Sequence, residues 1–111
     1  YLLSEATRGR IPYEKVVEVC AENPAKIFGC TEKGALAPGK DADIVLYDPT
    51  IPSTITNDKM HSDCDYTIWE GTELSGYITE TYSRGKLVFE DGAFVGEKGW
   101  GKFVKCAPRK V

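Results

Sequence analysis

The spacing of apolar residues changes once along the chain, and this change constrains the fold most. Before Gly34, apolar residues recur at helical spacing from Tyr13 to Ala21, which predicts an amphipathic helix lying on a core. After Gly34, they occur in short runs separated by turn residues, which predicts strands. No helices alternate with these strands, so we expect an α+β chain with its helices first and a β-layer second.

Proline and glycine positions predict where the helices end. Asn23-Pro24 is expected to end the first helix, because the residue before a proline is biased away from the α-helical region. Asn23 is then expected to cap a second short helix that has Pro24 at its first position. Gly29 is expected to be the C-terminal stop of that helix. Upstream, Gly9-Arg10 indicates a break before the first helix.

The residues that follow Gly34 predict short extended segments. Residues 42–49 form an apolar run bounded by aspartate and proline, which indicates a buried strand. Residues 51–55 are expected to form a separate extended piece. Residues 57–75 are polar and irregular, with Trp69 as their main apolar anchor. This segment is expected to be a loop.

Hairpins are predicted in the last third of the chain. Residues 77–82 alternate in polarity as a strand does, and a turn at Arg84-Gly85 leads into residues 87–89. Asp91-Gly92 is a typical two-residue hairpin turn and leads into residues 93–95.

The composition argues against several classes of function. The chain has 111 residues and a net charge of −3, so it lacks the basic surface that nucleic acids or anionic membranes attract. No run of about 20 apolar residues occurs, which predicts no membrane span. The first residues have no basic segment and no initiator methionine, so we expect no signal peptide and a part of the protein upstream. The basic end is expected to be solvated and comprises Lys102, Lys105, Arg109 and Lys110.

The four cysteines are far apart in the sequence, at Cys20, Cys30, Cys64 and Cys106. They lack the closely paired spacing of zinc-finger or zinc-ribbon ligands. Because no secretion signal or dense cysteine framework accompanies them, we expect free thiols in a reducing compartment. This predicts a cytoplasmic protein.

The single histidine does not predict a metal site. A hydrolytic metal centre needs several histidines and carboxylates that leave one coordination position open. His61 has only Asp58, Asp63 and Asp65 nearby in the sequence. A solvated side chain or a hydrogen-bond partner is the simpler interpretation of His61.

Other chemical patterns are equally incomplete. Ser75 and Ser83 lack the nucleophile elbow of hydrolases, and the glycines of segment 96–101 do not lie between a strand and a helix. Asp41 and Asp43 precede a predicted strand and are expected to shape its turn. The aromatic residues, which are expected to serve packing or a subunit contact, are Tyr66, Trp69, Tyr77, Tyr82 and Trp100. We therefore predict no catalytic, cofactor-binding or metal-binding residue in this chain.

Several blocks resemble known enzymes over nearly the whole chain. Asn23-Pro24-Ala25-Lys26, followed by Lys33 to Val45, resembles the segment of cyclic amidohydrolases that leaves the last barrel helix and enters a small β-sandwich. Later blocks resemble the dihydropyrimidinases and hydantoinases, with His61 preceding Asp65-Tyr66 as in that family. These blocks are W-E-G-T-E-L-S-G at 69–76, R-G-K-L-V-F-E-D-G at 84–92 and G-W-G-K-F-V at 99–104.

The resemblance implies a fold and an activity for a larger protein. In that family a (β/α)₈ barrel carries the active site and both chain ends build the sandwich. The family opens cyclic amides of dihydropyrimidines or hydantoins at a binuclear zinc site. Its ligands are histidines, a carboxylated lysine and an aspartate, all of which lie upstream of the block that begins at Asn23. None of these ligands matches a residue here, so the chain alone is expected to be inactive.

The resemblance also predicts how the chain is divided. Residues 1–33 are expected to be terminal helices of the TIM barrel, residues 34–95 strands of the small β-sandwich, and residues 96–111 a tail that contacts another subunit. The expected partners are the upstream barrel and further copies in a dimer or tetramer. The alternatives are a non-catalytic dihydropyrimidinase-related scaffold, another amidohydrolase such as allantoinase or dihydroorotase, and a free-standing binding module.

Overall fold

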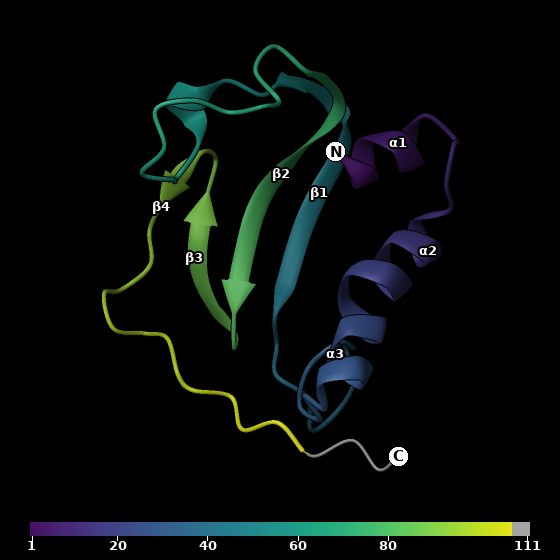
Figure 1. Cartoon of the computed structure of the whole chain (residues 1–111), viewed down its shortest axis with the longest axis vertical. Helices are drawn as coiled ribbons and strands as arrows, with labels where there is room; N and C mark the ends of the chain where they lie inside the picture. The colour runs from purple at the N-terminus through teal and green to yellow at the C-terminus, as the bar shows by residue number, and fades with distance from the viewer. Residues whose placement is uncertain (108–111) are drawn as a thin grey trace.

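Helices and strands occupy separate parts of the chain in the computed structural model, which describes residues 1–107 (Figure 1). Arg109 and Lys110 of the predicted basic end lie outside the described residues. The helical elements are α1 (Leu2–Thr7), α2 (Tyr13–Val17), the π-helical η1 (Glu18–Glu22), α3 (Asn23–Phe28) and the short 3₁₀ turn η2 (Asn57–Lys59). The strands are β1 (Ile44–Thr54), β2 (Glu73–Ser83), β3 (Lys86–Glu90) and β4 (Ala93–Phe94).

The strands form one curved antiparallel sheet in the order β1-β2-β3-β4, with the helices beside β1 (Figure 1). Strand β1 pairs with β2 from Ile44, opposite Tyr82, to Thr54, opposite Glu73. It is a single strand, so the prediction of two separate extended pieces was wrong. A register shift between Asp48 and Pro52 lets the chain pass its prolines without ending the strand, because the bulge leaves residues there unpaired.

The two predicted hairpin turns are confirmed. Arg84 and Gly85 have φ angles of 49° and 78°, and Asp91 and Gly92 have φ angles of 45° and 87°. Two consecutive residues with positive φ match the right-handed twist of the flanking strands. Sequence rules for two-residue turns therefore place the connections between β2 and β3 and between β3 and β4 correctly.

The helix does not break at Asn23-Pro24, which corrects the prediction. Asn23 has φ −65° and ψ −45°, so α2, η1 and α3 continue into one another. The π-helical turn just before Pro24 widens the helix, which accommodates the proline ring and its missing N–H. Asn23 makes no cap, because its Nδ2 donates to Glu18 Oε1 at 3.4 Å. Gly29 does end the helix in the left-handed conformation, as predicted.

Helix α1 was not predicted, and contacts far away in the sequence hold it. Residues 2–7 are too few to be helical on their own. The helix packs against β2, where the backbone N–H of Ser75 donates to Ser4 Oγ at 2.8 Å. Ser75 itself lies within β2, which begins at Glu73, so the predicted loop ends three residues earlier than expected.

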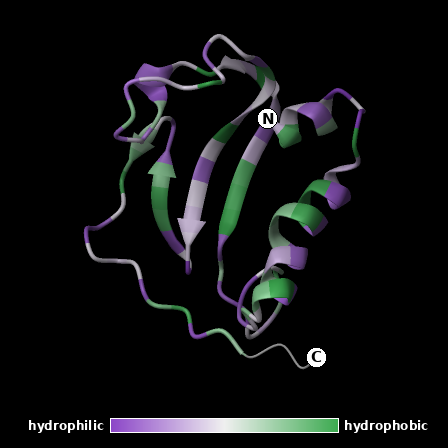
Figure 2. Cartoon of the chain, viewed as in Figure 1, coloured by the Kyte–Doolittle hydropathy of each residue, from purple (hydrophilic) through white to green (hydrophobic). Residues whose placement is uncertain are grey.

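Little apolar surface is buried within residues 1–107. Ala6 and Val16 are the buried apolar residues of this part of the chain. Val45 and Leu46 in β1 are 50% and 43% exposed, so the prediction of a fully buried strand is wrong for this chain by itself. Figure 2 shows the apolar segments of β1 and of the helices, and the strands of residues 1–107 form a single sheet. No helix in residues 1–107 is long and apolar enough to cross a membrane.

The segment after β4 runs past the end of the sheet and returns to α3 (Figure 1). Trp100 donates from Nε1 to the carbonyl oxygen of Ser83 at 3.0 Å, and the guanidinium of Arg84 lies 4.5 Å from the Trp100 ring centroid. Farther along, the N–H of Ala107 donates to the Gly29 carbonyl oxygen at 2.8 Å. The glycines of segment 96–101 thus belong to an extended strap and do not open a helix.

Candidate functional site

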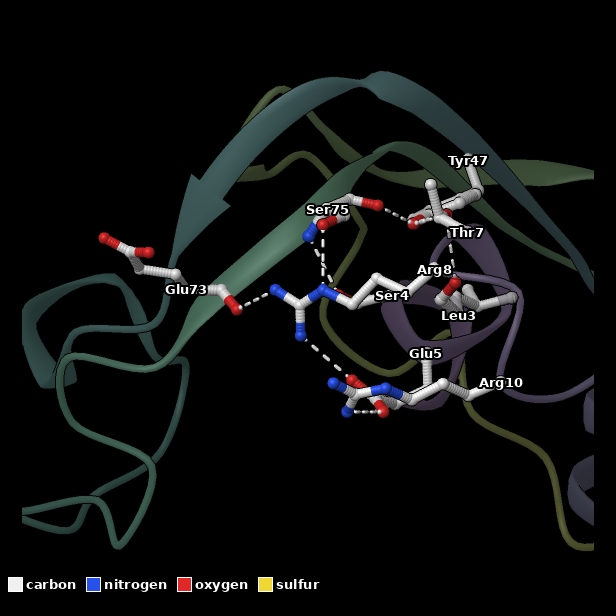
Figure 3. Close-up of polar contacts among 9 residues, drawn as sticks. All are labelled: Leu3, Ser4, Glu5, Thr7, Arg8, Arg10, Tyr47, Glu73 and Ser75. Carbon is white, nitrogen blue, oxygen red and sulfur yellow. Dashed lines mark hydrogen bonds and ion pairs between the residues drawn. The ribbon is translucent and has the colours of Figure 1, made fainter.

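The densest polar network joins α1 to β1 and β2 (Figure 3). Arg8 is its centre, and its guanidinium reaches three groups. It donates to the Glu73 carbonyl oxygen at 2.9 Å, to Ser75 Oγ at 3.0 Å and to Glu5 Oε1 at 2.9 Å. Because the arginine uses separate nitrogens for strand and helix, it fixes the position of α1 against the beginning of β2.

Tyr47 completes this network from the side of β1. Its hydroxyl donates to the Ser75 carbonyl oxygen at 2.6 Å and lies 2.7 Å from Thr7 Oγ1. Thr7 Oγ1 also donates to the Leu3 carbonyl oxygen at 3.1 Å and lies 2.8 Å from the Tyr13 hydroxyl. Tyr47 in β1 therefore links its strand to β2 and to α1 through one hydroxyl group, and Thr7 extends the network to Tyr13 of α2.

Glu5 is buried beneath two arginines. Hydrogen bonds from Arg10 and then Arg8 lower the pKa of Glu5 below its usual range, against an opposing effect of burial. The Arg10 contact measures 2.6 Å. The carboxylate is thus held charged and has no free access to a reacting group. Its geometry suits structural support of α1 and does not suit acid–base chemistry.

A second ionic cluster closes the loop between α3 and β1. Lys33 Nζ lies 2.8 Å from Asp41 Oδ2 and 2.5 Å from Asp43 Oδ2, and these two carboxylates, Asp41 foremost, raise the pKa of Lys33. Asp43 also accepts the backbone N–H of Arg84 at 2.8 Å. Burial opposes ionisation of Asp43, but hydrogen bonds from Lys33 and Arg84 lower its pKa overall. The prediction that Asp41 and Asp43 shape a turn agrees with this geometry.

A cavity of about 460 Å³ lies between the start of α1, the sheet and the η2 loop. Apolar side chains such as Leu3, Ile78 and Phe89 dominate its lining. His61 stands at its edge, with Nε2 3.2 Å from the Gly92 carbonyl oxygen and its ring edge-on to Phe89 at 5.8 Å. A single histidine that contacts a backbone carbonyl and a phenylalanine ring does not supply a nucleophile, an acid–base pair of side chains or a set of metal ligands.

The residues considered for chemistry are not brought together. No group of three or more histidine, cysteine, aspartate or glutamate side chains suited to a metal occurs in residues 1–107. Ser75 is engaged by Arg8 through its hydroxyl, and no histidine is among its hydrogen-bond partners. Within the described residues we therefore find structural networks and an apolar cavity, and no catalytic constellation.

The aromatic residues do not form a single patch. The Trp69 ring packs against Tyr1 at a centroid distance of 5.1 Å, whereas Trp100 lies between Arg84 and Lys86 at the other end of the sheet. These two tryptophans anchor the long loop and the C-terminal strap separately. A contact of the strap with another subunit stays a prediction.

Two cysteines that are far apart in the sequence meet in the fold. Cys30 follows α3 and Cys106 lies in the strap, and their sulfur atoms are 3.5 Å apart. All four cysteines are free thiols, as expected. Nothing in the spacing of the cysteines predicts this pair, because 76 positions separate them.

The comparison with known families identifies the chain. The model of the amidohydrolase family matches residues 2–88, which include α1, the continuous helix, the two ionic clusters and most of the sheet. The chain belongs to the amidohydrolase family.

Curated and solved amidohydrolase relatives are similar to almost the whole chain. The D-phenylhydantoinase of Escherichia coli O127:H6 (strain E2348/69) is 43% identical over 101 residues, covering 90% of this chain and 22% of the relative. A solved D-hydantoinase is 40% identical with a TM-score of 0.87, covering 94% of this chain and 23% of that one. The D-hydantoinase (dihydropyrimidinase) from Thermus sp. is 41% identical with a TM-score of 0.85, covering 91% of this chain and 22% of that one.

This chain therefore spans about a fifth of the length of the relatives it matches. The predicted resemblance to hydantoinases and dihydropyrimidinases is confirmed. The network around Arg8, the Tyr47 hydroxyl and the thiol pair were missed in the sequence. Each depends on side chains that meet only after the sheet and helices have packed.

Proposed function

We propose that this chain is the C-terminal structural part of a cyclic amidohydrolase that hydrolyses the ring amide of dihydropyrimidines or hydantoins. The observation that carries this proposal is the match of nine-tenths of the chain to about a fifth of proteins named as hydantoinases. An identity of 40–43% over 90% or more of the chain supports a common architecture and the same class of reaction.

The exposed apolar faces support a position inside a larger protein. Val17, Ile27 and Phe28 on the helices are 56%, 56% and 69% exposed. The cavity beside α1 is also lined mainly by apolar groups. An apolar surface of this extent costs free energy in water unless other residues cover it. We propose that the upstream barrel of the same protein covers the helical face, residues 1–33 being its terminal helices and residues 34–95 part of its sandwich.

The residues of this chain do not fit a hydrolytic metal centre. His61 contacts a backbone carbonyl and a phenylalanine, and residues 1–107 offer no group of three potential ligands. A binuclear zinc centre in the complete protein would accordingly be held by residues outside this chain. We propose that the residues of this chain support the barrel structurally. We also propose that the complete protein is a cytoplasmic homo-oligomer with residues 96–111 at a subunit contact.

The first test measures ring opening by the complete natural polypeptide that carries this sequence. Hydantoin and dihydrouracil are incubated with the complete polypeptide and, in parallel, with purified chain 1–111 and added zinc. Loss of the cyclic amide is followed by chromatography, with and without a chelator. We expect turnover by the complete polypeptide alone. Chelator-sensitive turnover by chain 1–111 would contradict the structural role.

Further substrates separate the alternatives. If a folded complete polypeptide opens neither ring, dihydroorotate and allantoin are tested next. Turnover of one of these would assign another branch of the family, and no turnover of any ring would favour a non-catalytic scaffold. Either result would refute the proposed substrate class while leaving the family membership intact.

A matched pair of variants tests the covered face. Phe28→Asp places a charge on the exposed apolar side of α3, and Lys26→Asp places the same side chain on an already polar, exposed site. In the complete polypeptide, we expect Phe28→Asp to abolish most soluble, active protein, because burying an unpaired carboxylate is costly. Lys26→Asp should behave nearly as the parent. Equal yields of the two variants would show that the barrel does not cover this face.

A further inference from the structure

The strap that follows β4 is bound to the end of α3 at one place. The N–H of Ala107 donates to the Gly29 carbonyl oxygen at 2.8 Å, and one residue away on each segment the Cys30 and Cys106 sulfurs are 3.5 Å apart. Backbone and side-chain contacts therefore hold the same two segments together. The thiols meet because the strap is docked, and their contact does not depend on one flexible side chain.

The helix end is built to receive the strap. Gly29 adopts φ 69° and the N–H of Cys30 donates back to the Ala25 carbonyl oxygen at 2.8 Å, which completes a Schellman-type helix end. A Cβ atom at Gly29 would lie 2.0 Å from the Ala107 carbonyl oxygen. Only glycine permits this approach, so the position of Cys30 relative to the strap is fixed by backbone geometry.

We propose that Cys30 and Cys106 form a reversible disulfide that fastens the strap to the end of α3 when the surroundings become oxidising. A disulfide needs a sulfur separation of about 2.05 Å, and rotation about the side-chain bonds of two residues already in contact supplies the remaining approach. The bond joins residues 76 positions apart, so it ties the strap to the helical part of the chain. This inference is independent of the substrate of the complete protein, but it requires that Cys106 stay open to solvent when residues 96–111 contact another subunit.

The reaction is a two-step exchange with an external disulfide such as oxidised glutathione. The Cys106 thiolate, which is exposed, attacks one glutathione sulfur and releases the first glutathione as a thiolate. The Cys30 thiolate then attacks Cys106 Sγ and releases the second. The protein gives up two protons and two electrons in total, one sulfur–sulfur bond forms, and the oxidised glutathione is reduced to two thiols.

The order of the steps follows from the surroundings of the two thiols. Cys30 is half-buried, and its hydrogen bond with Cys106, followed by burial, raises the pKa of the Cys30 thiol. It therefore remains protonated more readily and is harder for a bulky oxidant to reach. Once Cys106 carries glutathione, its thiol hydrogen bond with Cys30 is gone, and Cys30 is the neighbouring attacking group.

The other two cysteines provide internal controls. Cys20 and Cys64 are exposed, and neither has a sulfur contact among the described residues. Cys64, which lies outside the helical face proposed to contact the barrel, is expected to take up glutathione singly, because no neighbouring thiol resolves the mixed disulfide. A general reactivity of the thiols can thus be separated from a specific pair within the same molecule.

The experiment is peptide mapping of the complete natural polypeptide after titration with reduced and oxidised glutathione. Trypsin places Cys30 in peptide 27–33 and Cys106 in peptide 106–109, whereas Cys20 and Cys64 fall in peptides 16–26 and 60–84. We expect a crosslinked species of 27–33 with 106–109 that disappears with reductant. The variants Cys30→Ser and Cys106→Ser should lose it, and the double variant Cys20→Ser/Cys64→Ser should retain it in full.

A second measurement keeps the result independent of peptide recovery. Limited proteolysis at Lys102 and Lys105 should slow in the oxidised parent and remain unchanged in Cys106→Ser, because the closed bond restrains the strap. Glutathione bound singly to all four cysteines, with no crosslinked species and no protection, would overturn the proposal. A crosslink that joins Cys30 or Cys106 to Cys20 or Cys64 instead would overturn it as well.

Discussion

Replacement of Gly76 by alanine tests the packing of α1 and the sheet most severely. Gly76 has φ 139°, a backbone conformation that residues other than glycine rarely adopt. An alanine Cβ would lie 1.8 Å from the Tyr47 hydroxyl oxygen and 2.1 Å from Tyr47 Cζ. The ring cannot move aside freely, because its hydroxyl bonds to the Ser75 carbonyl and contacts Thr7.

Two costs add in this substitution. A strained backbone conformation costs about 1–3 kcal/mol, and forcing extra atoms into a packed site costs about 1–3 kcal/mol. We therefore expect Gly76→Ala to lower the free energy of unfolding by about 2–6 kcal/mol. A loss of that size is a large part of the roughly 5–15 kcal/mol that stabilises a typical domain.

The assay is urea unfolding of the complete polypeptide, followed by tryptophan fluorescence. Gly39→Ala is the matched control, because Gly39 has φ 85° but no atom within 4 Å of the added Cβ, so only the backbone term applies. The double variant Tyr47→Ala/Gly76→Ala should recover about 1–3 kcal/mol relative to the sum of the single changes. The reasoning fails if Gly76→Ala costs no more than Gly39→Ala, or if the double variant shows no recovery.

Three further changes probe the polar networks by the same unfolding assay. Arg8→Ala should lower the free energy of unfolding by about 1–3 kcal/mol, because partly buried acceptors lose a charged donor. Arg8→Lys should have an intermediate effect. An unchanged urea midpoint in Arg8→Ala would show that the α1 network is dispensable. Arg10 and Arg8 lower the pKa of Glu5 below its ordinary 4.5, so its stabilisation is present above that value and is lost as pH falls through the lowered pKa. Glu5→Gln should therefore unfold with a flatter acid dependence, and an identical acid profile would contradict this. Asp43→Ala should cost more than Asp41→Ala, by about 1 kcal/mol, because Asp43 also accepts a backbone N–H that alanine cannot accept. Equal costs would contradict the assigned contacts.

Local rules predicted the parts of the fold that depend on neighbouring residues. Arg84-Gly85 and Asp91-Gly92 adopt positive φ angles that the turn chemistry requires, and Gly29 ends its helix for the same reason. The blocks that resemble hydantoinases were also sufficient to find the family. In these places, a few adjacent residues decide the structure without help from distant ones.

Other parts could not be predicted, because distant contacts decide them. Helix α1 is stabilised by the contacts of Ser4 and Arg8 with β2. Its sequence has no capping side chain and no long apolar stripe that would predict a helix. The bias against a helical residue before Pro24 was outweighed by a π-helical turn that keeps the helix continuous. The structural networks and the Cys30–Cys106 pair likewise arise from tertiary packing.

The prolines of β1 have a consequence beyond the register shift they cause. Strand β1 is an edge of the described sheet and is 11 residues long, a length at which an open edge can template addition of a strand from another molecule. Pro49 and Pro52 remove two backbone donors from this edge. A strand that lacks these donors is a poorer template for an added strand, which is the gatekeeper effect of proline against aggregation.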